Sequence, residues 1–135
     1  MQYRVDKFLP HAFEAIKQVK IKVKDKWFGL VERDETIPKA YKGYIAQLGA
    51  SIIQAGVKAA LTFYEAEEKG SEQDRRLVTA AIKYILTEGK KSDHKLSEWL
   101  VENDPNFEQI QQKAEAIMDA ATALKLALRT YKMGD

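Results

Sequence analysis

The sequence predicts an all-α fold, a single-domain bundle of about six helices in which the first and the last are long. Two observations predict it. Apolar residues recur every three or four positions in successive segments, and glycine, proline or capping residues separate these segments. The chain has 135 residues, of which 45% are hydrophobic, and this is enough for one core. We therefore expect one helical domain over residues 1–135.

The first predicted helix begins near Val5 and reaches Trp27. Its apolar residues share one stripe on a helical wheel: Val5, Leu9, Ala12, Phe13, Ile16, Val19, Val23 and Trp27. The end of this segment, KQVKIKVKDK (residues 17–26), also alternates as a strand would. A strand would account only for Val19, Ile21 and Val23 and would leave the upstream stripe unexplained, so we favour the helix. Ile21 then falls on its far side.

The second helix is predicted to begin near Pro38, after a loop with Thr36 as a candidate N-cap. It ends before Gly56, a residue suited to a left-handed C-cap. Its inward stripe comprises Ile37, Tyr41, Tyr44, Ile45, Leu48, Ile52 and Ala55. Gly43 and Gly49, inside this helix, indicate either close packing of a neighbouring helix or ligand, or simple tolerance.

Four more helices are expected. The third covers residues 57–68, and the fourth follows a capping pair, Ser71 and Asp74, and ends before Gly89. A short fifth helix carries Leu96 and Leu100, and the last runs from about residue 106 to residue 132. No segment requires a strand.

Charge is unevenly distributed along the chain, although the net charge is only +2. Residues 1–60 hold 11 basic and 6 acidic residues, a balance of +5, and residues 61–135 hold 11 basic and 14 acidic residues, a balance of −3. We expect an electrically lopsided molecule. There is no cysteine, signal-peptide pattern or apolar run of about 18 residues, so we expect a cytoplasmic protein without a membrane segment.

Catalytic and cofactor motifs are missing from the sequence. His11 and His94 have no metal-ligand spacing and are interpreted as surface residues, and no phosphate-binding glycine loop precedes a helix. The acidic run EAEEK (residues 65–69) lies at a helix end and is interpreted as a solvated face. We therefore expect no enzyme, metal or cofactor.

The basic residues of the first half permit two interpretations. Lys17, Lys20, Lys24, Lys39 and Lys42 could form one positive face for RNA phosphates, with Tyr41 and Tyr44 as aromatic neighbours. Lysines beside an apolar stripe also commonly cover the edge of the core with their methylenes. Composition alone favours the second interpretation.

A family resemblance begins at residues 40–64, AYKGYIAQLGASIIQAGVKAALTFY. Its tyrosine-led helix, apolar Leu48 and Ile52, and the pair Gly56 and Val57 resemble the small helical subunit of type III-B CRISPR effector complexes, the fifth protein of the Cmr module. LALRTYK (residues 126–132) resembles the aromatic and basic ending of that family. The chain departs from the family pattern at Val57, where leucine is usual, at Gly49 and Ala55, where a proline and an asparagine are common, and near Ala127, where a tryptophan is expected.

The resemblance implies a non-catalytic subunit of an antiviral, RNA-guided complex. Such subunits stack head to tail as a minor filament beside the backbone subunit and abut the large polymerase-like subunit, with guide and target RNA nearby. Charge and helix geometry, rather than identity with the family, select the candidate RNA contacts: Lys17, Lys20, Lys24, Lys39, Lys42, Arg129 and Lys132. The alternative is a helical protein-protein interaction module without nucleic acid, which would dock through Ile21, Ile53 and the tyrosines.

Overall fold

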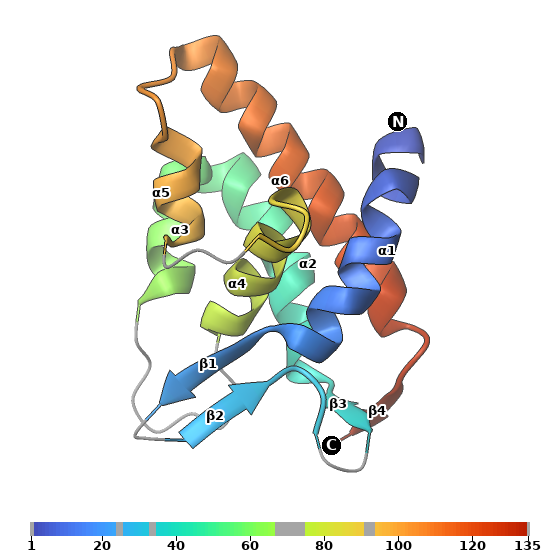
Figure 1. The fold of residues 1–135 in the computed structure, drawn as a ribbon. Helices are drawn as coiled ribbons and strands as arrows, with labels where there is room; N and C mark the ends of the chain where they lie inside the picture. The colour runs from blue at the N-terminus through green and yellow to red at the C-terminus, as the bar shows by residue number, and fades with distance from the viewer. Residues whose placement is uncertain (1, 24–25, 33–34, 67–74, 91–93, 135) are drawn as a thin grey trace.

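The computed structural model describes residues 2–23, 26–32, 35–66, 75–90 and 94–134. Six helices fill most of the molecule, and two pairs of short strands lie together at one end (Figure 1). The helices are α1 (Gln2–Gln18), α2 (Ala40–Ala55), α3 (Val57–Glu65), α4 (Arg75–Leu86), α5 (Leu96–Val101) and α6 (Phe107–Leu128). The strands are β1 (Lys20–Val23), β2 (Lys26–Gly29), β3 (Thr36–Pro38) and β4 (Lys132–Gly134). The predicted six-helix bundle is confirmed.

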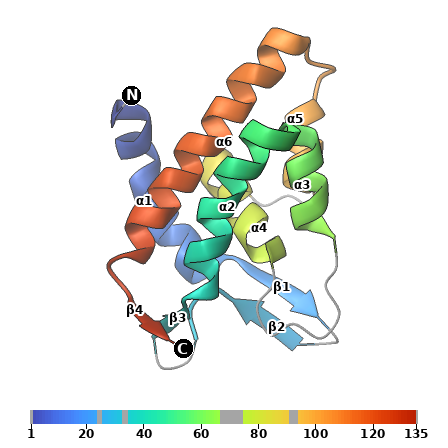
Figure 2. The ribbon, with the colours of Figure 1, turned by 180° about the vertical axis from the view of Figure 1, so that it is seen from behind.

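The longest helix, α6, organises the core. Its first turn is closed by a capping box, in which the Gln109 amide donates to Asn106 Oδ1 and the Asn106 amide donates to Gln109 Oε1, each at 2.9 Å. Several of its buried residues are alanines, which let other helices approach closely. Helices α1, α2 and α4 pack against it, and α2 and α6 run side by side in Figure 2. Buried residues from all six helices join one hydrophobic cluster.

The first predicted helix is too long by nine residues. Helix α1 ends at Gln18, and the following residues form an antiparallel hairpin in which Lys20 pairs with Gly29 and Val23 pairs with Lys26. The strand interpretation of KQVKIKVKDK was therefore the correct one for its second half. Alternating β-branched residues favour a strand when a partner strand follows closely, as KWFG does here.

A second strand pair was not predicted. Strand β4, near the C-terminus, runs parallel to β3, and the Lys39 amide donates to the Gly134 carbonyl at 3.2 Å. Thr36 is therefore a strand residue rather than an N-cap, helix α2 begins two residues after Pro38, and α6 ends at Leu128 instead of Lys132. Pairing between segments almost a chain length apart leaves no signal in local periodicity.

The remaining boundaries follow the predicted breakers where the structure describes them. Gly56, with φ of 94°, separates α2 from α3, and Gly89, with φ of 80°, follows α4. The third helix is an exception, because α3 ends at Glu65, before an extended Ala66, and not at residue 68 as predicted. Gly70 and the capping pair Ser71 and Asp74 lie outside the described residues. Within the described ranges, no helix combines the length and apolar character needed to cross a membrane.

Candidate nucleic-acid interface

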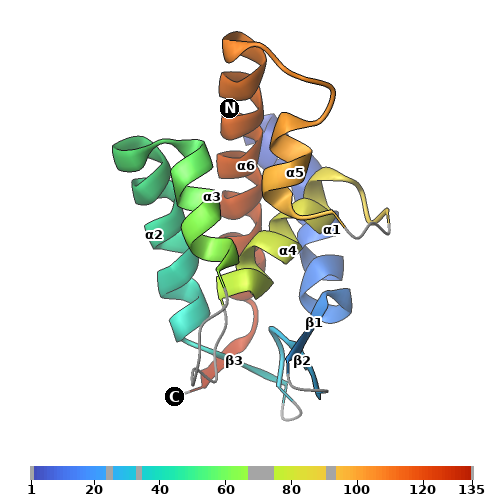
Figure 3. The same cartoon turned by 90° about the vertical axis from the view of Figure 1, so that its left-hand side faces the viewer.

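The predicted RNA contacts gather at one end of the bundle, which we call the strand end. It comprises the last turn of α1, the four strands, the first turn of α2 and the residues that follow α6 (Figures 1 and 3). Lys24 lies outside the described residues. The other candidates are all exposed and all belong to the strand end: Lys17, Lys20, Lys39, Lys42, Arg129 and Lys132.

Strand pairing brings these residues together from distant parts of the sequence. Strand β4 carries Lys132 to the side of β3, and the bond from the Lys39 amide to Gly134 holds the start of α2 next to it. The turn from α1 into β1 carries Lys17 and Lys20 to the same end. Glu32 and Glu35, exposed between β2 and β3, add two carboxylates to the strand end, so its charge is predominantly but not uniformly positive.

The aromatic neighbours predicted for this face are not available to a ligand. The Tyr41 side chain is only 2% exposed, and the Tyr44 ring packs edge-on against it with centroids 5.9 Å apart. The Arg75 guanidinium covers the Tyr44 ring at 4.5 Å, and the Tyr64 hydroxyl donates to the Tyr44 carbonyl at 2.6 Å. Burial raises the pKa of Tyr64, while the positive charge of Arg75 opposes that shift. The pairing of lysines with Tyr41 and Tyr44 was wrong because both rings serve the core.

Strand β2 exposes two aromatic residues that the sequence reasoning missed. Trp27 is 65% exposed and Phe28 is 41% exposed. Trp27 had been assigned to the buried stripe of a helix that ends nine residues earlier. The available signal was two alternating runs, KIKV and KWFG, separated by two residues, which is the spacing of a β-hairpin.

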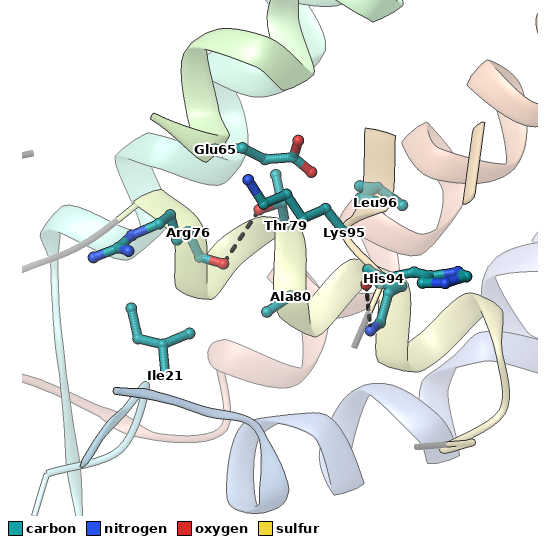
Figure 4. A pocket seen from close by; sticks show the side chains of 9 residues that line it. Ile21, Glu65, Arg76, Thr79, Ala80, His94, Lys95 and Leu96 are labelled. Atoms are coloured by element: carbon teal, nitrogen blue, oxygen red, sulfur yellow. Dashed lines mark hydrogen bonds between the residues drawn. The ribbon is translucent and has the colours of Figure 1, made fainter. Parts of the chain in front are cut away.

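A shallow cavity of about 170 Å³ lies between β1, α4 and the start of α5 (Figure 4). Its polar groups tie helices together. Lys83 Nζ donates to the His94 carbonyl at 2.6 Å, and the Glu65 carboxylate accepts from the Ser97 amide at 3.0 Å and from the Ser97 hydroxyl. Glu65 is half-buried, so this member of the EAEEK run joins two helices instead of forming a solvated face.

No group of three or more His, Asp or Glu residues that could hold a metal ion occurs in the described part of the chain. His94 is exposed as predicted, whereas His11 is half-buried. The glycines of α2 have no close neighbours, because a Cβ placed on Gly43 or Gly49 meets no described atom within 4 Å. Simple tolerance therefore explains Gly43, and Gly49 borders an open groove between α2 and α6.

The opposite end of the bundle, which we call the acidic end, carries Glu102 and Asp104 on exposed positions between α5 and α6, and Glu108 in the first turn of α6. Phe107, which is 77% exposed, lies among them. Figure 3 shows this end farthest from the strands. Lys58, also exposed at the start of α3, offsets part of the negative charge. The predicted uneven distribution of charge thus appears as a mainly positive strand end and a mainly negative acidic end.

These features define a class: a small helical protein with a basic end and an acidic end. The family comparison then identifies it. Residues 6–129 match the family described as CRISPR-associated protein (Cas_Cmr5). The chain belongs to this family and is a component of a Cmr-type CRISPR complex, as the resemblance in the sequence indicated. No curated protein and no solved structure matches the chain.

Proposed function

We propose that this chain is the non-catalytic small subunit of a type III-B effector complex, that it helps to hold guide and target RNA, and that it stacks with copies of itself as a minor filament. Its partners in this proposal are the backbone subunit, the large polymerase-like subunit and the RNA, in the cytoplasm and in antiviral defence. Membership of the Cas_Cmr5 family and the absence of catalytic motifs from the sequence support a holding role.

The observation that carries the RNA part is the strand end itself. Six exposed cations from three separate stretches of the chain, residues 17–20, 39–42 and 129–132, lie at this end. Each cation that neutralises a phosphate releases condensed counterions, and this release drives binding that weakens as salt rises. On single strands the slope of log affinity against log salt is about −0.7 for each such contact.

The filament part rests on the unlike ends. A basic surface on one copy and an acidic surface on the next form a heterologous contact, which repeats along an open assembly instead of closing as a dimer. Exposed apolar side chains at the acidic end, Phe107 and Val101, supply surface that such a contact would bury.

The docking patch of the alternative, a protein-protein interaction module, does not form as predicted. Ile21 is half-buried and lines the cavity against α4, and Tyr41 is buried, whereas Ile53 is exposed near the end of α2 that is remote from the strands. These residues do not share one exposed surface.

The RNA proposal is tested by replacing Lys20, Lys42 and Lys132 together with alanine in the assembled complex. Because three phosphate contacts would be lost, we expect the salt slope to become less negative by about 2 and RNA retention to fall for all sequences alike.

The matched control replaces three exposed lysines away from the strand end, Lys7, Lys58 and Lys90, and changes the net charge by the same amount. This variant should retain RNA as the unmodified complex does. If both variants lose RNA equally, the loss results from net charge and not from contacts at the strand end. If the strand-end variant retains RNA as before, the proposed contacts are refuted.

A further inference from the structure

The β1–β2 hairpin presents a face of unusual composition to solvent. Side chains alternate between the two faces of a strand, and the register pairs Lys20 with Gly29 and Lys22 with Trp27. Lys20, Lys22 and Trp27 therefore share one face, and all three are exposed. We call this the outer face of the hairpin. It combines a large aromatic ring with two cations within a few residues.

The opposite face fixes how the hairpin lies. Ile21 and Phe28 are paired on that face, and Ile21 lies on the α4 side of β1, where it borders the cavity with Ala80 (Figure 4). The base of the hairpin is also anchored in the core, because Val19 before β1 is 8% exposed and Leu30 after β2 is fully buried. The outer face is thus turned away from the bundle by its own anchoring.

Gly29 lies on the outer face, opposite Lys20 and two residues after Trp27. A Cβ at this position would lie 3.3 Å from the Val19 carbonyl oxygen, which is tighter than an ordinary contact, and 3.5 Å from Lys20 Cγ. Glycine therefore lets the two strands approach closely here, and no side chain stands on the outer face at this position.

An exposed tryptophan leaves a large apolar ring in contact with water. Burial of this ring against a flat, apolar surface is therefore favourable. A ring beside two cations on the neighbouring strand matches the base and the adjoining phosphates of a single strand of nucleic acid. Stacking of bases on aromatic side chains, with lysines along the backbone, is the physical basis of single-strand binding. Bases inside a duplex are already stacked, so the fitting ligand is an unpaired segment.

We infer that Trp27 stacks on an unpaired RNA base while Lys20 and Lys22, side by side on the neighbouring strand, contact the adjoining phosphates. The inference rests on the proposed RNA-holding function and gives it a second component, recognition of unpaired bases, which phosphate contacts alone do not supply. The expected preference is for unpaired over duplex RNA with little regard to base identity, because every base offers a flat face.

The test uses the full chain with Trp99→Phe, so that Trp27 is the sole indole. Trp99 lies in α5 under the Lys113 ammonium at 4.9 Å, and phenylalanine keeps a ring in that contact. Tryptophan emission is followed at low salt during addition of a mixed-sequence RNA 12-mer, or of an abasic 12-mer with the same number of phosphates. We expect quenching and about tenfold tighter binding with the base-containing strand.

Variants then separate stacking from charge, with binding followed by the anisotropy of labelled RNA. Trp27→Ala should bind the 12-mer about tenfold more weakly, with the same salt slope, and should no longer distinguish it from the abasic strand. Trp27→Phe should keep most of the preference. The matched control is Phe63→Ala, which removes an aromatic ring that is 60% exposed on α3 and should change neither affinity.

Three results overturn the inference. If both strands bind equally and Trp27→Ala leaves affinity unchanged while the lysine variants still lose RNA in the complex, the proposed function stands and stacking is refuted. If the full chain binds neither strand, stacking by this chain is refuted. The proposed function is then tested only by the lysine variants in the assembled complex. If Trp27→Ala weakens self-association but not RNA binding, the outer face is a protein contact.

Discussion

Glu65 joins the end of α3 to the start of α5, and its removal tests whether this link stabilises the fold. Its carboxylate accepts the Ser97 amide at 3.0 Å and the Ser97 hydroxyl. Helix α5 has only six residues, and its first amides have no partner within the helix. A second backbone amide at this helix start, that of Lys95, donates a hydrogen bond to Glu98 Oε1 at 2.9 Å. Glu65 therefore acts as an N-terminal cap supplied by a neighbouring helix.

The expected cost follows from the two bonds. Hydrogen bonds to a charged group contribute about 1.5–3 kcal/mol each when well shielded, and less where water reaches them. Glu65 is half-buried, so we expect Glu65→Ala to lower the free energy of unfolding by about 2 kcal/mol and the Tm by roughly 8 °C. Glu65→Gln keeps one carbonyl oxygen and should cost about 1 kcal/mol.

The assay is urea denaturation of the full chain in a double-mutant cycle. Glu65→Ala, Ser97→Ala and the double variant should give a coupling free energy of about 1 kcal/mol between the two side chains. Glu102→Ala is the matched control, because Glu102 lies at the other end of α5, where a negative charge opposes the helix dipole. This variant should be neutral or slightly stabilising. A coupling near zero, or a loss at Glu65 no larger than at Glu102, would refute the capping role.

Two further predictions concern a tyrosine and two glycines. The hydrogen bond from the Tyr84 hydroxyl to the Glu14 carboxylate raises the pKa of Tyr84 to about 12, so its stabilising effect is complete below pH about 10 and is lost as pH rises toward 12. Titration of tyrosinate absorbance should show a tyrosine near pH 12 that moves toward 10 in Glu14→Gln, while the raised pKa of Tyr64 stays where it is. An unchanged profile would contradict the contact. Gly56→Ala should cost about 1–3 kcal/mol because its φ is 94°, whereas Gly43→Ala should stabilise by about 1 kcal/mol because its Cβ meets no described atom. If Gly56→Ala and Gly43→Ala shift the urea midpoint in the same direction, this prediction is wrong.

Local sequence was sufficient for most helices. The apolar stripe of α2 predicted that Ile45, Leu48 and Ile52 are buried, and they are. Gly56 and Asn106 were predicted at helix boundaries and lie there. These features depend on residues within a turn or two of one another, since helical hydrogen bonds and caps connect neighbours in the chain. A pattern of that range can be interpreted without knowing the fold.

The functional surface was only partly predictable. The candidate lysines were chosen by charge, and those that the structure describes do share one end of the molecule. Trp27 was misplaced because its wheel position agreed with a helix that does not extend so far. Tyr41 was expected beside the lysines, yet its side chain is buried, and Arg75 from α4 covers the ring of the neighbouring Tyr44. Exposure of a side chain depends on which element covers it, and that element is distant in sequence.

By itself the sequence determined the helical class, the core stripes, most helix ends and the family resemblance, because periodicity and capping act over a few residues. Tertiary structure alone decided that Trp27 lies on the outside of the hairpin, that β4 pairs with β3, and that the Lys39 amide bonds to Gly134. Strand pairs gain their hydrogen bonds from another part of the chain. The position of the strand pairs, and of the charged side chains that they bring to one end, is therefore defined only when the whole chain has folded.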